Sequence, residues 1–196
     1  MTADFDRLLK EIRSCRLCAG KLKHEPRPVI RANPTAQICI AGQAPGTRVH
    51  ASGIPFTDPS GDRLRMWLGI DNDTFYNDAK IAIVPMGFCF PGLDAQGGDL
   101  PPRKECAPQW RDRVFEGLPN LKLMLPIGLY AQSWHLKGKL KANMTDTVKT
   151  WRDYGPNIIP LPHPSWRNNV WLMKNPWFEA EVLPHLRRRV SRILKP

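Results

Sequence analysis

Four short apolar segments, each bounded by glycine or proline, recur along the chain at residues 37–41, 80–84, 122–127 and 157–161. Their nearly continuous apolar character is typical of strands that are buried on both faces, as in a parallel sheet. Around these segments apolar residues recur at helical spacing. That spacing predicts helices over residues 3–14, 60–68, 108–116, 129–136 and 176–194.

The alternation of predicted strands and helices favours an α/β fold. We expect a three-layer sandwich, with a central four-stranded parallel sheet flanked by helices. Neither an internal repeat nor a linker interrupts the pattern, so residues 1–196 are expected to form a single domain. The basic, proline-bearing stretch over residues 19–34 is expected to be a loop.

Charge narrows the choice of partners. The chain has 29 Lys and Arg against 18 Asp and Glu, a net charge of +11. This favours a polyanionic partner such as nucleic acid, although a soluble basic protein without such a partner has the same composition. The longest apolar run, residues 81–93, is broken by Pro85 and Pro91, so we expect no membrane segment. The N-terminus lacks an apolar signal core, and we expect a cytoplasmic monomer.

The chain has five cysteines, an odd number that a closed disulfide framework cannot use completely. Cys15 and Cys18 form a C-x2-C pair, while Cys89 and Cys106 lie far downstream. Four thiolates are sufficient for a tetrahedral zinc ion or an iron–sulfur cluster, and the aromatic neighbours of Cys89 suit a cluster. The alternative is a set of unrelated thiols. Cys39 falls inside a predicted strand and is expected to belong to the core.

Ligands of open α/β sheets bind beyond the carboxyl ends of the strands. The loop after the first predicted strand has small residues that let backbone approach a ligand closely. It matches neither a dinucleotide-binding G-x-G-x-x-G motif nor a Walker phosphate loop. Shortly after it, Phe56 is either a core residue or a platform for a planar ligand, and Asp58 is placed to cap the next helix. The loop after the first predicted strand consists of Gly42, Gln43, Ala44, Pro45 and Gly46.

The loop after the fourth predicted strand, residues 162–168, reads P-H-P-S-W-R-N. Its prolines fix the direction of His163, and a rigid imidazole can donate a hydrogen bond to developing negative charge. Trp166 and Arg167 are suited to stack on a base or to bind a phosphate. A loop histidine whose hydrogen bonds are satisfied by backbone is the alternative. Read together with the glycine-rich loop, His163 favours a site between the two loops.

These motifs together resemble the uracil-DNA glycosylase superfamily, most closely its iron–sulfur members of the family 4 type. The 162–168 string also resembles the corresponding loop of the single-strand-selective members. The resemblance covers residues 15–168 and rests on the order of motifs that are individually weak. They are the C-x2-C pair, the loop at residues 42–46, G-I-P-F at residues 53–56, Cys89 and Cys106, I-G-L-Y-A at residues 127–131, and H-P-S at residues 163–165.

The chain departs from the family pattern at three positions. The acidic residue of the family's first loop is Gln43 here, and the asparagine four residues before the third cluster cysteine is Pro85. The family's glycine after the phenylalanine turn is Asp58. The fold and the metal site are therefore implied more directly than the base preference or the group that activates water.

The resemblance implies a DNA repair enzyme that flips uracil out of DNA and hydrolyses its N-glycosidic bond. His163 would stabilise the departing base, while Gln43, or secondly Asp58, would orient the attacking water. Trp166 and Arg167 would contact DNA that contains uracil. The resemblance also implies that a 4Fe-4S cluster, or zinc as the alternative, is bound by Cys15, Cys18, Cys89 and Cys106. The residues that it implies for contacts with the substrate are Gly42, Ala44, Pro45, Gly46, Phe56, Ser165 and Asn168.

Other functions stay open. A non-catalytic, zinc-stabilised DNA-binding module explains the charge and the cysteines but gives the two loops no purpose. A nucleotide hydrolase or transferase needs a set of carboxylates for Mg²⁺, and the sequence has no clustered acidic motif. A glycosylase for another deaminated base, such as hypoxanthine, is consistent with Pro85 in place of asparagine.

The C-terminal segment is strongly basic and has two interpretations. It could contact DNA phosphates, or it could be the solvated face of a helix. Its basic residues are Arg187, Arg188, Arg189, Arg192 and Lys195.

Overall fold

The computed structural model describes residues 2–195 and has a parallel sheet at its centre. The strands are β1 (Ile38–Ala41), β2 (Ile81–Ile83) and β3 (Leu123–Pro126), in the order β2-β1-β3. Ile38 pairs with Ile81 on one side and with Leu123 on the other, both in parallel register. The α/β class and the parallel sheet flanked by helices are therefore confirmed.

The fourth predicted strand, residues 157–161, lies beside β3 but forms only isolated bridges with it, so the prediction of four strands is wrong. The Ile159 N–H donates to the Met124 carbonyl and the Leu161 N–H donates to the Pro126 carbonyl, both at 3.0 Å. Between these two hydrogen bonds, a regular parallel ladder would have a bond donated by the backbone N–H of residue 126, which is Pro126. Proline has none, so the ladder is interrupted at that residue.

Each predicted helix is present, and four of them agree with their expected bounds within two residues. The helix expected over residues 176–194 is instead a π-helical segment, Phe178–Val182, followed by an α-helix, Leu183–Leu194. The short helices were not predicted because segments of four to six residues do not display a helical period. No helix within residues 2–195 combines the length and apolar character that crossing a membrane requires. The α-helices are α1 (Thr2–Arg13), α2 (Thr47–Ser52), α3 (Pro59–Leu68), α4 (Asn72–Phe75), α5 (Cys106–Glu116), α6 (Gly128–His135), α7 (Met144–Lys149), α8 (Asn169–Lys174) and α9 (Leu183–Leu194).

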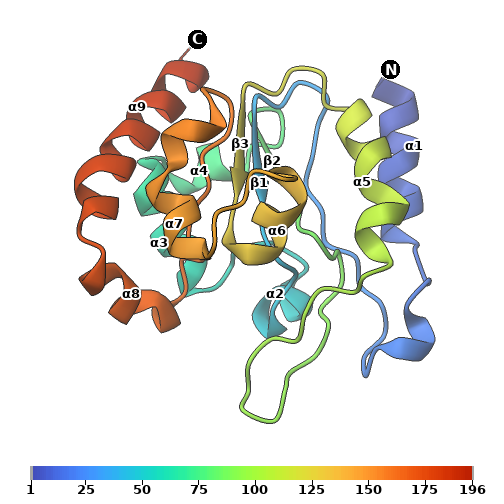
Figure 1. Cartoon of the computed structure of the whole chain (residues 1–196). Coiled ribbons are helices and arrows are strands. Elements are labelled where there is room, and N and C mark those ends of the chain that lie inside the picture. The colour runs from blue at the N-terminus through green and yellow to red at the C-terminus, as the bar shows by residue number, and fades with distance from the viewer. Residues whose placement is uncertain (1, 196) are drawn as a thin grey trace.

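Helices cover both faces of the sheet, with α1 and α5 on one side and α3 and α9 on the other (Figure 1). Successive strand residues point to opposite faces, so each face has its own core. Ile38 and Ile40 of β1 pack with α3 and α9, whereas Cys39 between them packs with α1 and α5. The core position predicted for Cys39 is confirmed, and burial raises the pKa of its thiol to about 12.

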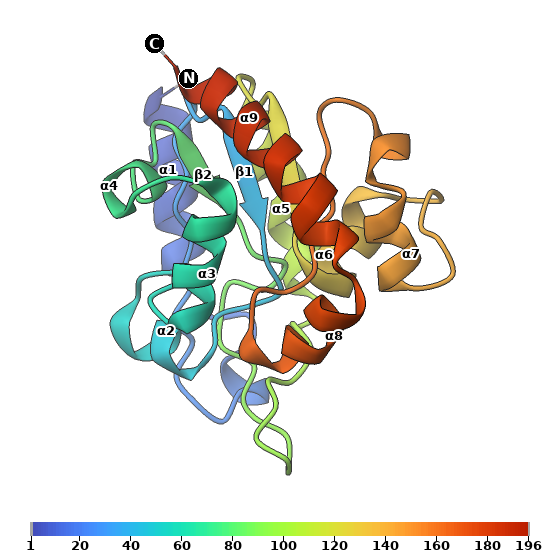
Figure 2. The same ribbon diagram turned by 90° about the vertical axis from the view of Figure 1, so that its left-hand side faces the viewer.

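All strands run in the same direction, so the loops that follow them meet at one edge of the sheet. Helix α2 and the loop around residues 90–100 lie at this edge, and the loop projects beyond the rest of the molecule (Figures 1 and 2). The C-terminal end of α9 lies at the opposite edge. The site expected from the strand-end loops therefore has to lie near α2 and the projecting loop.

Candidate active site

A pocket of about 70 Å³ opens at the carboxyl edge of the strands. Loops that follow β1, β2 and the bridged segment line it together with the turn before α3. Among its lining residues are eight that the sequence predicts for the site: Gly42, Gln43, Ala44, Pro45, Gly46, Phe56, Asp58 and His163.

The other predicted residues lie around the mouth of this pocket. Ser165 and Arg167 line an adjoining, more open hollow of about 420 Å³, which also includes Gln43 and His163. Trp166 lines neither of these two hollows and is 70% exposed. The strand-end rule thus brings the predicted loops together, with the His163 loop forming both a wall and a rim.

The His163 ring is held in one orientation by its own loop. The Ser165 backbone N–H donates to Nδ1 at 3.2 Å, and the Asn168 side-chain amide donates to the His163 carbonyl at 2.7 Å. Because Nδ1 accepts, we assign the proton of the neutral ring to Nε2. Burial lowers the pKa of His163 and outweighs the opposing charge of Asp58, so the ring stays neutral. The loop therefore presents a neutral N–H donor at the pocket.

The loop after β1 is anchored to its neighbours but leaves two amides free. The Gly42 carbonyl accepts from the Met86 N–H at 2.9 Å, and the Gln43 side-chain amide donates to the Leu100 carbonyl at 3.2 Å. Considering residues 2–195, the backbone N–H groups of Gln43 and Ala44 have no hydrogen-bond partner. Adjacent free amides of this kind are suited to bind the carbonyl oxygen of a ligand.

Phe56 lies against this loop in an unusual backbone conformation. Its φ is +56°, in the left-handed region that residues other than glycine rarely adopt. The tip of its ring is 3.5 Å from the position that a Cβ on Gly42 would occupy. The ring also packs edge-on against Phe75, with 6.0 Å between the centroids. A planar ligand held by the first loop would therefore meet the Phe56 ring.

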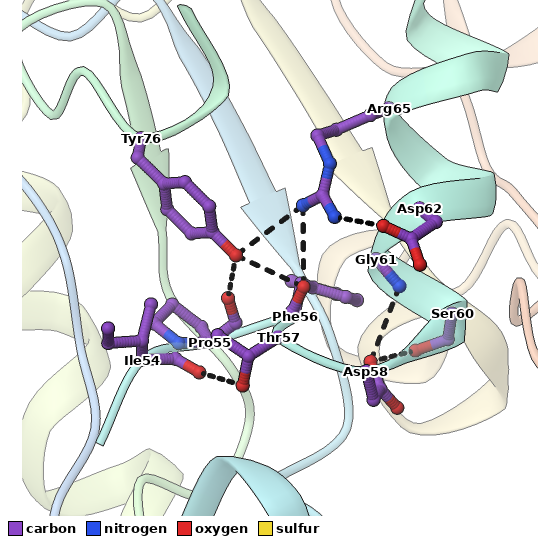
Figure 3. Close-up of polar contacts among 10 residues, drawn as sticks. All are labelled: Ile54, Pro55, Phe56, Thr57, Asp58, Ser60, Gly61, Asp62, Arg65 and Tyr76. Carbon is purple, nitrogen blue, oxygen red and sulfur yellow. Dashed lines mark hydrogen bonds and ion pairs between the residues drawn. The ribbon is translucent and has the colours of Figure 1, made fainter. Parts of the chain in front are cut away.

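Hydrogen bonds from two distant residues hold this strained turn (Figure 3). The Tyr76 hydroxyl lies 2.9 Å from the Pro55 carbonyl and 3.1 Å from the Phe56 carbonyl, and Arg65 donates to the latter at 3.3 Å. A Cβ on Gly61 would lie 1.8 Å from the Phe56 carbonyl oxygen, so only glycine fits there. The sequence analysis missed Arg65 and Tyr76, because only tertiary packing brings them to the turn.

Asp58 is the N-cap of α3, the default role considered for it. Its Oδ1 accepts from the Gly61 N–H at 3.3 Å and from the Ser60 hydroxyl at 2.6 Å. An N-cap of this kind contributes about 1 kcal/mol to helix stability. Asp58 also lines the pocket, so one carboxylate supports both the helix and the wall of the site.

Trp166 and Arg167 form an exposed rim beside the pocket. They begin the 3-10 turn Trp166–Asn168, and the Arg167 guanidinium lies over the Trp166 ring at 5.5 Å. Arg167 also donates to the Gly97 carbonyl at 3.1 Å, which joins this rim to the projecting loop. Arg63 of α3 donates to the Ser165 carbonyl at 3.0 Å and anchors the rim from the other side. A flat aromatic ring and a cation therefore face solvent at the mouth of the site.

The projecting loop contributes Asp99, a pocket residue that the sequence analysis missed. Leu93 and Asp99 form an isolated antiparallel bridge that closes the loop. Between them, Asp94 Oδ1 accepts from the N–H groups of Gln96 and Gly98, at 2.9 and 2.7 Å. Burial raises the pKa of Asp99. The glycine pair before Asp99 indicates a tight turn, but nothing in the sequence indicates that the turn reaches the pocket.

The four cysteines predicted to bind metal line one small, largely apolar hollow, although they are far apart in sequence. Cys15 and Cys18 follow α1, Cys89 follows β2, and Cys106 is the first residue of α5. All four thiols are free. Cys39 lies apart from this hollow, in the core beneath α1 and α5.

The thiols of this hollow are buried to different degrees, and hydrogen bonds reach some of them. The Phe88 N–H donates to Cys106 Sγ at 3.3 Å, and the Arg27 N–H donates to the Cys89 sulfur. Burial raises the pKa of the Cys89 and Cys106 thiols to about 11 and about 12. In the part of the chain that the structure describes, no group of three or more His, Cys, Asp or Glu side chains is arranged to hold a metal ion. A zinc ion requires four sulfurs about 2.3 Å from one centre, whereas a cluster spreads its thiolates over several irons. The cluster remains a prediction.

Comparison with known protein families gives one match over well more than half of the chain. The model of the Uracil DNA glycosylase superfamily matches residues 30–187. The matched region contains the pocket loops, Cys89 and Cys106, and begins after Cys15 and Cys18.

Proposed function

Because the chain belongs to the uracil-DNA glycosylase superfamily, we propose that it flips uracil out of DNA and hydrolyses its N-glycosidic bond. Membership of the superfamily supports the coarser description, a DNA glycosylase that acts as a hydrolase in DNA repair. The proposal for uracil rests on one observation. The Phe56 ring, the free amides of Gln43 and Ala44 and the neutral His163 ring all belong to one pocket.

Binding of the flipped base uses the first loop and Phe56. Extruding a nucleotide costs a few kcal/mol of stacking and pairing. The Phe56 ring offers a face for the extruded pyrimidine to stack on, and the amides of Gln43 and Ala44 donate to a carbonyl on its edge. Because Tyr76 and Arg65 hold the Phe56 turn before any ligand binds, little further ordering is needed.

Cleavage of the glycosidic bond requires stabilisation of a leaving anion. The bond breaks with its electron pair going to the base, which leaves an oxocarbenium-like sugar. His163, neutral and protonated on Nε2, donates a hydrogen bond to the base oxygen on which the charge develops. Its proton need not transfer, since a preorganised donor already lowers the barrier.

Water then adds to the sugar, and Gln43 or Asp58 would orient it. Gln43 and Asp58 both line the pocket, and each also makes a structural hydrogen bond, to the Leu100 carbonyl and to the start of α3. Gln43 can hold a water by hydrogen bonding but cannot ionise. Asp58 has a carboxylate side chain and lines the same pocket.

The rim residues contact the rest of the DNA. Trp166, at 70% exposure, is placed to fill the space that the extruded base leaves in the stack, and Arg167 is placed to contact a phosphate. Ser165 and Asn168 contribute by fixing the His163 loop rather than by contacting the base.

A second candidate is a glycosylase for another deaminated base. Pro85 lines the pocket where the family pattern has asparagine, and proline has no side-chain hydrogen bond with which to select the uracil edge. Its carbonyl accepts from buried Arg111 at 2.9 Å, which leaves the pyrrolidine ring as its contribution to the wall. Base selection in this pocket therefore depends on the backbone amides.

Cys15, Cys18, Cys89 and Cys106 are the residues that would hold a 4Fe-4S cluster. Bound there, the cluster would cross-link the end of α1, the loop after β2 and the start of α5, and supply no chemistry at the base. Zinc in the same place is the alternative.

The test is a glycosylase assay with a labelled oligonucleotide that carries one uracil, followed by alkaline cleavage of abasic sites. Parallel substrates carry hypoxanthine or a thymine mispair, in single-stranded and duplex form. His163→Ala protein purified identically controls for contaminating host glycosylase. Cleavage of the uracil strand by wild type alone supports the proposal, and cleavage of the hypoxanthine strand alone supports the second candidate. DNA binding without any cleavage, by a colourless protein with stoichiometric zinc, would instead identify the non-catalytic module.

A further inference from the structure

The loop over residues 93–99 brings a carboxylate into a pocket whose first loop lacks one. We propose that Asp99 is the catalytic carboxylate of this site, which holds the attacking water and supports the positive charge on the sugar. This inference rests on the proposed glycosylase function and names the residue that supplies its negative charge. The sequence predicts Gln43 or Asp58 as the residue that orients the water, and Asp99 is a further carboxylate beside them.

The position of Asp99 carries the argument. Its two carboxylate oxygens lie 3.5 and 3.7 Å from the place that a Cβ on Gly46 would occupy, so they face the backbone of the first loop. Asp99 lines both the main pocket and the adjoining open hollow, and both also contain Gln43 and His163. It therefore lies where the closed part of the site meets solvent, which is where water has access to a bound nucleotide.

The Asp99 carboxylate is uncommitted, unlike the other acids nearby. Asp58 uses Oδ1 to cap α3, and Asp94 uses Oδ1 to close its own turn. By contrast, Asp99 makes neither a hydrogen bond nor an ion pair with any residue between 2 and 195. Both of its oxygens remain available to accept hydrogen bonds from water.

Gln43 takes a different role in this arrangement. Its side-chain amide donates to the carbonyl of Leu100, the residue directly after Asp99. A carboxylate at position 43 could not donate this bond. Gln43 is therefore a positioning residue that holds the end of the projecting loop against the first loop, while Asp99 supplies the charge.

The reaction balances with water as the only co-reactant. The C1′–N bond breaks, and its electron pair leaves with the base, where His163 stabilises it by a hydrogen bond. The water oxygen forms a bond to C1′, and the water proton passes to the Asp99 carboxylate and then to solvent. The base anion takes a proton from solvent after release, so the products are free base and an abasic site.

The electrostatic surroundings set the pH dependence. Burial raises the pKa of Asp99 above its ordinary value of 3.8, as do the charges of Asp58 and Asp94, while Arg167 opposes them. His163, which also lines the pocket, is neutral because burial lowers its pKa. The ionised carboxylate is the active form, so activity should fall as the pH drops through the pKa of Asp99.

The experiment compares Asp99→Asn with Asp94→Asn in single-turnover excision of uracil from an oligonucleotide. Asp94→Asn removes a charge from the same loop but keeps Oδ1 to close the turn, so it is the matched control. We expect Asp99→Asn to lose about 10²-fold or more in rate, to bind the uracil DNA as wild type does, and to lack the acidic fall in the pH profile. We expect Asp94→Asn to stay within about threefold of wild type, and thermal melting to check that each variant is folded.

Two results would overturn the inference while leaving the glycosylase function intact. One is an Asp99→Asn variant with wild-type rate and pH profile, and the other is equal loss of rate in both variants. An Asp58→Asn variant measured in parallel should lose less rate than Asp99→Asn, and the reverse order would assign the carboxylate to Asp58. A wild-type protein that releases no base from any substrate would overturn the proposed function itself, and this inference with it.

Discussion

The pocket at the sheet edge and the hollow lined by cysteines are both formed by loops from distant parts of the sequence. In the pocket, hydrogen bonds within the chain fix His163 and Phe56. Ser165 orients His163, and Tyr76 with Arg65 holds Phe56. In the cysteine hollow the Cys106 sulfur accepts a hydrogen bond from the Phe88 N–H, but all four cysteines are free and no covalent link joins them.

This difference indicates two kinds of organisation. The pocket is preorganised, so its side chains are in place before a base arrives and removing one should change the rate more than the stability. The hollow is lined by four thiols from distant parts of the chain, and the proposed cluster would link them. Removing one cysteine should therefore change stability and colour more than it changes chemistry at the base.

The largest effect is expected for Cys106→Ala. If the hollow holds a cluster, loss of one thiolate should abolish the absorbance at about 400 nm and lower stability by at least about 3 kcal/mol, or roughly 10 °C in melting temperature. Absorbance spectra, iron content and thermal melting measure this. Cys39→Ala is the matched control, because Cys39 is fully buried outside the hollow and its variant should keep the absorbance. Colour that survives in Cys106→Ala and disappears in Cys39→Ala would contradict the assignment.

The next largest effect is expected for His163→Ala, on rate alone. Loss of one preorganised donor should slow single-turnover excision by about 10²–10³-fold, or about 3–4 kcal/mol in activation free energy. Melting should change little, since the ring sits on a loop at the pocket. His185→Ala on α9, outside the pocket, should leave the rate unchanged. Equal turnover by His163→Ala and wild type would contradict the catalytic role of this residue.

The same histidine has a predictable pH dependence. Burial lowers the pKa of His163 below 6.5, so the unfolded chain takes up this proton first as the pH falls. The stability contributed by the neutral buried ring is present above pH 6.5 and is lost progressively below it. In His163→Ala the stability measured by urea unfolding should fall less steeply from pH 7 to pH 5 than in wild type, whereas a parallel slope would show that the ring is not buried neutral.

A smaller effect on the rate is expected for Tyr76→Phe. Removing this hydroxyl leaves the Pro55 carbonyl without its donor and the Phe56 carbonyl with Arg65 alone. This should destabilise the protein by about 1–2 kcal/mol and let the Phe56 turn relax. We expect about a tenfold loss in kcat/KM, because a misplaced stacking surface weakens transition-state binding. Tyr154→Phe removes a similar bond, to the Lys139 carbonyl at 3.1 Å, away from the pocket. It should cost similar stability without loss of activity, and equal activity loss in both variants would exclude a specific role for Tyr76.

Local pattern was sufficient for β1, β2 and β3, for the longer helices and for two of the loops that line the pocket. Apolar runs that end in glycine or proline located β1, β2 and β3, and the strand-end rule then placed the Gly42 and His163 loops together. The prediction of a fourth strand was wrong for a local reason, since Pro126 belongs to β3 and its missing N–H affects the neighbouring segment. The sequence of residues 157–161 alone does not show that a residue of the neighbouring strand lacks the N–H that pairing requires.

Residues that act through tertiary placement were not predictable in this way. Tyr76 follows α4, a helix of four residues, and reaches the Phe56 turn only because the chain between them folds back. Asp99 reaches the pocket through a loop whose shape is set by Asp94 and by the Gln43 amide. In each case the sequence contains an ordinary residue type in an ordinary context, and the function arises from packing.

The smallest effect, on the salt dependence of DNA binding, should show whether the rim of the pocket or the basic C-terminal segment contacts DNA. Arg167 lies at the pocket mouth, whereas the C-terminal end of α9, with Arg192, lies at the opposite edge of the sheet (Figure 1). Arg187 on that helix already donates to the Met66 carbonyl at 3.0 Å, which favours a structural and solvated face over a DNA contact.

Salt dependence of DNA binding tests this distinction, because each phosphate contact adds to the slope of log K against log salt concentration. Arg167→Gln should reduce that slope by about one, measured by fluorescence anisotropy with a uracil-containing oligonucleotide. The double variant Arg188→Gln with Arg192→Gln removes two exposed charges from α9 and should leave the slope unchanged. The opposite result would be a reduced slope for the α9 variant and an unchanged slope for Arg167→Gln. It would place the DNA along α9. Such a result would also contradict the role of the pocket, because an enzyme that binds DNA at the far edge of its sheet could not present the extruded base to His163.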